Sequence, residues 1–176
     1  MVDAQTIGVL VTAASVTVAA IYYMLTLRST QRSMKNTLET RQVQMFMNIY
    51  SQFWGREFQS QWNEMMDWEY KDLDEFMTKY GHKTNPEAWT TLTSVCNFFE
   101  GIGVLIHRGY IDKTLVDDLT SGFVLRLWDK IKPIAYEYRR RNNWPSAFEW
   151  VEYLNNEIRK IVEQQNPELR GAKLST

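Results

Sequence analysis

Glu100 is the most unusual polar residue of the sequence, because it stands inside an otherwise apolar stretch, residues 98–106. His107 follows seven residues later, close to two turns of an α-helix, so the two side chains share roughly one helix face. A carboxylate and an imidazole placed in this way can bind a metal ion or move protons. Glu100 and His107 are therefore one candidate site, for a small metal-dependent enzyme or a ligand sensor.

The same carboxylate also has a structural interpretation. Arg126 lies on a later predicted helix and is the natural partner for a buried ion pair with Glu100. Such a pair is tolerated when its polar atoms are hydrogen-bonded, and it specifies packing more than it adds stability. Gly101 and Gly103 flank this position and would let another helix approach closely. A structural pair is the favoured interpretation.

Other charged clusters have simpler explanations than a site. The acidic residues between positions 64 and 75 lack the order of a calcium-binding loop, and a solvated helix face is expected. The triple arginine 139–141 could touch nucleic acid or lipid head groups, but basic residues are also favoured at a helix C-terminus. The chain has two histidines and no phosphate loop, nucleotide fingerprint, nucleophile elbow or Cys/His array. We expect no metal and no cofactor, and an enzyme is the less favoured class.

Composition sets the broad limits. The 176 residues carry a net charge of −1, so the chain has no strong field to attract nucleic acid, and no nucleic-acid partner is expected. Aromatic residues make up 14%, which is typical of a folded chain. The single cysteine, Cys96, lies in an apolar run and cannot form an intrachain disulfide. We expect it to be a small buried apolar group in a reducing compartment.

Residues 4–27 contain no charged side chain and predict a transmembrane helix. A helix of that length is about 36 Å long at ~1.5 Å per residue, enough for a hydrocarbon core of about 30 Å. A signal peptide and a buried helix of a soluble protein are the alternatives. Basic residues follow the segment and an acidic residue precedes it, which predicts an N-terminus outside and a cytoplasmic C-terminal side at the cell membrane. The basic side chains expected to face lipid are Arg28, Arg32 and Lys35.

The pattern of apolar residues predicts helices in the rest of the chain, without a convincing strand pattern. We predict a transmembrane anchor over 1–27, a basic helical stalk over 28–42, a helical cytoplasmic domain over 43–165 and a flexible tail over 166–176. The fold class is all-α, a transmembrane helix that continues into a bundle of about five or six helices. Predicted boundaries are Gly55, Gly81, Asn85-Pro86, Gly109, Asp112, Ser121-Gly122 and Pro145. Pro133 is expected either to kink its helix or to mark its boundary.

Several motifs resemble a known family. They are the segment Asn97–Leu105 followed by Arg108–Asp112, the segments Trp128–Pro133 and Trp150–Leu154, and the Tyr-x-x-Phe pattern from Tyr50 to Phe53. Together they are similar to a prokaryotic domain of unknown function, number forty-seven-sixty, over about residues 5–160. The resemblance implies an N-terminal membrane helix before the domain. It implies no established activity, substrate or cofactor, and it carries over no catalytic residue.

A tether joined to a helical domain without a catalytic constellation favours an interaction module. We therefore expect a single-pass membrane protein that recruits a protein partner or associates with itself, with membrane lipid as its other contact. The enzyme or ligand sensor centred on Glu100 and His107 is the alternative.

Overall fold

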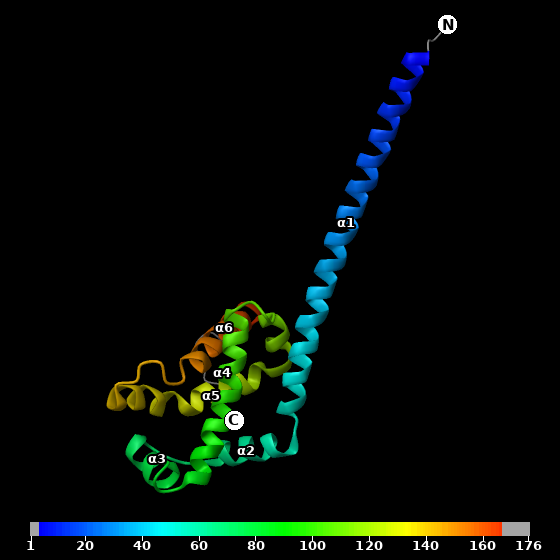
Figure 1. Cartoon of the computed structure of the whole chain (residues 1–176). Helices are drawn as coiled ribbons and strands as arrows, with labels where there is room; N and C mark the ends of the chain where they lie inside the picture. Colours follow the sequence, from blue (N-terminus) through cyan, green and yellow to red (C-terminus); the bar gives the residue numbers. More distant parts are fainter. Residues whose placement is uncertain (1–3, 167–176) are drawn as a thin grey trace. The chain divides into compact units, whose positions relative to one another are not determined.

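The computed structural model describes residues 4–166, which form six α-helices and contain no strand within that range (Figure 1). The helices are α1 (Ala4–Phe53), α2 (Arg56–Asp67), α3 (Leu73–Tyr80), α4 (Pro86–His107), α5 (Lys113–Asn142) and α6 (Glu149–Gln165). The predicted all-α class is confirmed. Almost all of the predicted flexible tail, residues 167–176, lies outside the described residues.

The chain divides into two units between Gln44 and Met45. In the first unit, every α1 side chain described from Ala4 to Arg41 is exposed. This part of α1 is long and apolar enough to cross a membrane. Helix also covers the predicted stalk, residues 28–42.

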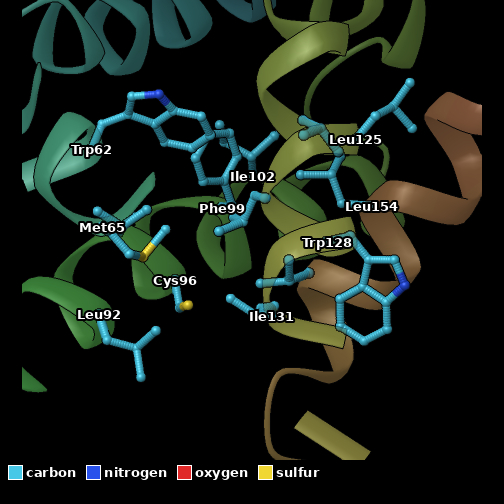
Figure 2. Close-up of a cluster of buried hydrophobic side chains, with 14 of the residues drawn as sticks. Trp62, Met65, Leu92, Cys96, Phe99, Ile102, Leu125, Trp128, Ile131 and Leu154 are labelled. Atoms are coloured by element: carbon cyan, nitrogen blue, oxygen red, sulfur yellow. The ribbon is translucent and has the colours of Figure 1, made fainter. Parts of the chain in front are cut away.

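The second unit begins with the last turns of α1, where Phe46 and Phe53 are completely buried. Its α6 packs along both α4 and α5, and α2 packs along α4, while α3 contacts α4 and α5 (Figure 1). Apolar side chains from all six helices meet in one core, and Figure 2 shows part of it. The side chains labelled there are Trp62, Met65, Leu92, Cys96, Phe99, Ile102, Leu125, Trp128, Ile131 and Leu154. Cys96 is 1% exposed, which confirms its interpretation as a buried apolar group.

Local sequence explains where three of the helices begin. Asp72, Asn85 and Asp112 each accept a backbone N–H bond at the first turn of α3, α4 and α5, at 2.8–3.1 Å. These are the side chains that favour the N-cap position, and Pro86 follows its cap at the first helical residue, as predicted.

The predicted break at Ser121-Gly122 is wrong, because α5 runs through it without interruption. Helix α5 also continues through Pro133, so this proline does not mark a boundary. Gly122 lowers the stability of the helix by about 1 kcal/mol relative to alanine. The nearby side chains of Val116, Thr120 and Val124 are buried, and their burial offsets this cost. Pro133 removes one helical hydrogen bond. Nearby, the Lys130 carbonyl accepts a bond of 2.7 Å from the Tyr70 hydroxyl.

Pro145 does not begin the last helix as predicted. It lies in the turn between α5 and α6, and α6 starts at Glu149. The preceding residue, Phe148, has a left-handed backbone and provides no side-chain cap. The free backbone N–H groups in the first turn of α6 therefore need a hydrogen-bond acceptor from another part of the fold.

Candidate functional site

A cavity of about 480 Å³ opens between α4, the end of α5 and the turn that joins α5 to α6. Ligand sites for small molecules usually measure about 300–1,000 Å³ and combine apolar walls with a few polar groups. This cavity fits that description. Its lining consists of His82, Trp89, Thr93, Cys96, Asn97, Glu100, Tyr138, Trp144, Ser146, Ala147 and Phe148.

Helix α4 supplies one wall of the cavity. Trp89, Thr93, Cys96, Asn97 and Glu100 follow each other at spacings of one to four residues, which places them on one side of an α-helix. The same helix buries another side in the core, so its register is set by apolar packing. Core packing therefore directs this polar and aromatic row toward the cavity.

The Glu100 carboxylate replaces the missing cap of α6. Its Oε1 atom accepts hydrogen bonds from the backbone N–H groups of Trp150, at 3.2 Å, and Val151, at 3.0 Å. Those groups belong to the first turn of α6, where free N–H groups and the helix dipole favour a negative charge. Glu100 is half-buried, and this burial raises its pKa, although the two N–H bonds act in the opposite direction.

Gly103 makes this contact possible. A Cβ atom at this position would lie 2.4 Å from the backbone oxygen of Trp150, closer than real Cβ contacts. Only glycine lets α4 approach the first turn of α6 so closely, as predicted for Gly103. The same expectation for Gly101 is wrong, because a Cβ there would meet nothing within 4 Å.

The turn from α5 to α6 forms another wall of the cavity. Its two ends, Asn143 and Phe148, have positive φ angles of 47° and 59°. This conformation is uncommon for a bulky aromatic residue, and such strain often occurs at functional sites. Arg139 stabilises the turn, because its Nε donates to the Ala147 carbonyl at 2.7 Å while its Nη1 pairs with Glu152 at 2.6 Å.

Aromatic rings form a continuous chain along the cavity wall. The centroids of His82 and Trp89 are 5.5 Å apart, and Trp89 lies 6.0 Å from Tyr138. Tyr138 is in turn 6.4 Å from Trp144 and 6.1 Å from Phe148. The cavity thus has one carboxylate and an extended aromatic surface.

Arg126 does not pair with Glu100. It is exposed and lines a separate hollow with residues 118–123, and no ion pair or hydrogen bond joins the two side chains within residues 4–166. The predicted pair is wrong because Arg126 lies exposed in that separate hollow, and the partners of Glu100 are instead backbone amides of α6.

His107 lies outside the cavity, exposed at the end of α4. Its ring packs against Trp150, at a centroid distance of 4.9 Å, and against Tyr153, at 5.3 Å. Glu100 and His107 therefore both contact Trp150, one at its backbone and one at its ring. The histidine that shares the cavity with Glu100 is His82. Among residues 4–166, no group of three or more His, Cys, Asp or Glu side chains could hold a metal ion.

The arginines 139–141 all have acidic partners within the domain. Besides the Arg139–Glu152 pair, Arg140 pairs with Glu137 at 2.6 Å, and Arg141 pairs with both Glu137 and Asp74. They occupy the last turn of α5, which agrees with the interpretation based on the helix C-terminus.

The predicted lipid-facing residues Arg28, Arg32 and Lys35 are exposed on the first unit of α1. Lys35 forms an exposed i,i+4 ion pair with Glu39 at 3.8 Å. Exposed pairs of this kind contribute little stability. The charges of Arg28 and Arg32 are thus presented on the helix surface just after its apolar stretch.

Sequence reasoning found Glu100 but missed the aromatic lining of the cavity. His82, Tyr138, Trp144 and Phe148 come from three separate segments, and each has an ordinary local context. The polar row on α4 that contains Thr93 and Asn97 was the available signal, because it interrupts the apolar pattern on one face.

The fold and site define a small helical domain that follows one long apolar N-terminal helix. The family model described as Domain of unknown function (DUF4760) matches residues 9–158, and the chain belongs to this family. The resemblance noted from the sequence is thereby confirmed. No curated protein and no solved structure matches the chain.

Proposed function

We propose that the chain is a single-pass membrane protein whose helical domain binds a small ligand in the cavity between α4, α5 and α6. The observation that carries this proposal is a ligand-sized cavity of about 480 Å³ with a half-buried carboxylate on an aromatic wall. Small-molecule sites combine apolar walls with a few polar groups that orient the ligand, and this combination supports binding.

The membrane part of the proposal rests on α1. Residues 4–27 serve as the anchor at the cell membrane, with the N-terminus outside and the domain in the cytoplasm. Arg28, Arg32 and Lys35 then lie near the anionic lipid surface, where each basic residue contributes up to ~1 kcal/mol of attraction. A fluorescent protein fused after Thr176 reports the orientation, because it matures in the cytoplasm. A protease-sensitive fusion on the outer side of intact cells would contradict the orientation.

A cavity-filling variant tests the ligand-binding function. Asn97 is exposed and lines the cavity, so Asn97→Trp would fill part of it without disturbing the core. Thr90→Trp is the matched control, since Thr90 is exposed on the same helix but does not line the cavity. The full chain in detergent is screened by thermal shift against cationic, anionic and neutral small molecules. A ligand that stabilises the wild type and Thr90→Trp but not Asn97→Trp supports the proposal, and the absence of any such ligand refutes it.

A protein-interaction module is the second candidate function, and exposed apolar residues at the end of α1 favour it. Met47 lies in the last turns of α1 and Trp54 directly follows its end, and they are 47% and 52% exposed. Tryptophan and methionine are enriched at protein interfaces. Affinity capture and crosslinking from membranes would compare the wild type with Trp54→Glu. The candidate fails if the wild type neither recovers a partner nor associates with itself, or if Trp54→Glu behaves like the wild type.

A further inference from the structure

The walls of the cavity combine two features that favour the same kind of ligand. We propose that the cavity binds a monovalent organic cation, a quaternary or protonated amine, between the Glu100 carboxylate and the aromatic rings of α4, α5 and their connecting turn. This inference rests on the proposed ligand-binding function and names its ligand class.

The carboxylate has room for a cationic partner. Both of its hydrogen bonds end on Oε1, which leaves Oε2 for a ligand. No lysine or arginine forms an ion pair with Glu100 within the described residues. The basic group that acts electrostatically on Glu100 is Arg139, and its guanidinium is already paired with Glu152. Glu149 adds a second negative charge nearby.

The aromatic rings supply the second half of the site. Trp89, Tyr138, Trp144 and Phe148 all line the cavity, and their centroids are linked at distances of 6.0–6.4 Å. Trp144 remains 54% exposed, although its ring is large and apolar. Faces of tryptophan and tyrosine attract cations, and groups of such rings recognise quaternary ammonium ligands.

Other ligand classes fit less well. An anion would be repelled by Glu100, the one cavity side chain that carries a negative charge at neutral pH and lacks an ionic partner. A metal ion needs several oxygen, nitrogen or sulfur ligands arranged around it, and no group of three or more His, Cys, Asp or Glu side chains within residues 4–166 could hold one. A neutral ligand would use the rings but leave the carboxylate without a charged partner.

Choline and its uncharged analogue 3,3-dimethyl-1-butanol test this inference, because they have nearly the same shape and differ in charge. Binding to the full chain in detergent is measured by titration calorimetry, with ligand-observed NMR for weak complexes. We expect choline to bind at least about tenfold more tightly than the analogue, and this factor corresponds to ~1.4 kcal/mol. Glu100→Gln, which keeps an oxygen acceptor for α6, should remove most of the difference. Trp89→Leu should lower the affinity for choline by about three- to tenfold, which is within the range of one cation–π contact.

The outcomes separate the two proposals. Equal binding of choline and the analogue, or unchanged choline affinity in Glu100→Gln, overturns the cation inference while a ligand found by the screen keeps the ligand-binding function. Choline binding that survives Asn97→Trp also overturns it, because the cation would then bind elsewhere. If neither compound binds, the cation inference fails, and the library screen alone decides the ligand-binding function.

Discussion

Replacing Gly103 by alanine should separate α4 from the first turn of α6. The added Cβ would lie 2.4 Å from the Trp150 oxygen, and the atoms must move apart by at least 0.6 Å to reach the 3.0 Å limit of real Cβ contacts. The obstacle is backbone, so no side-chain rotation relieves it. The same movement would lengthen the bonds from Trp150 and Val151 to Glu100, because they join the same two helices.

The magnitude follows from three contributions. Overpacking costs about 1–3 kcal/mol, and weakening the acceptor at a helix N-terminus costs ~0.5–2 kcal/mol. The higher helix propensity of alanine returns ~1 kcal/mol. We expect Gly103→Ala to destabilise the domain by about 2 kcal/mol. Gly101→Ala is the matched control, because its Cβ meets nothing within 4 Å and should stabilise the domain by up to ~1 kcal/mol.

Urea unfolding of the full chain in detergent, followed by tryptophan fluorescence and far-UV circular dichroism, measures both variants. The expected free energies of unfolding differ by about 3 kcal/mol between the two alanine variants. The reasoning is refuted if Gly103→Ala is as stable as Gly101→Ala. A loss of choline affinity in Gly103→Ala but not in Gly101→Ala would further connect the close approach of the helices to the cavity.

Four further predictions concern Glu100, Lys130 and helix α5. Glu100→Ala should cost about 1–2 kcal/mol at neutral pH because α6 loses its acceptor, whereas Glu100→Gln should retain most of the stability. Burial raises the pKa of Glu100 in the folded state. The stability of the wild type relative to Glu100→Gln should therefore be largest below the ordinary carboxyl pKa, about 4.3, and should decrease as pH rises through the folded-state pKa. A stability difference that grows with pH in urea titrations would contradict this. Lys130 of α5 donates to the backbone oxygens of Met66 and Trp68 at the end of α2, so Lys130→Met should destabilise by ~1–3 kcal/mol, and an unchanged unfolding midpoint would show that water replaces it. Gly122→Ala should stabilise by up to ~1 kcal/mol in the same assay, because α5 is helical there and a Cβ meets nothing within 4 Å; destabilisation would indicate a bend at that position.

Local patterns predicted most of the helices because their causes lie within a few residues. Asn85-Pro86 and Asp112 start α4 and α5 through bonds that span two or three residues, so the sequence reveals them directly. The uninterrupted course of α5 was not predictable in this way. Its flanking side chains are buried against other helices, and that burial outweighs the local preferences of glycine and proline.

The position of Glu100 shows the same division within the site. Its occurrence in an apolar stretch indicates that a buried carboxylate needs a partner, because desolvation without compensation is unfavourable. The partner itself could not be predicted as a side chain, since it is the backbone of α6. Only the close approach at Gly103 brings those amides within 3.2 Å of the carboxylate.

By itself, the sequence determined an all-helical chain with an apolar N-terminal helix, a buried cysteine and one unusual carboxylate. These features depend on hydropathy, spacing and caps, which act over short distances along the chain. The tertiary structure decided what faces that carboxylate. Packing of α6 on α4 and α5 brings His82, Tyr138 and Phe148 from separate segments around one cavity, and such contacts depend on how helices distant in sequence approach each other.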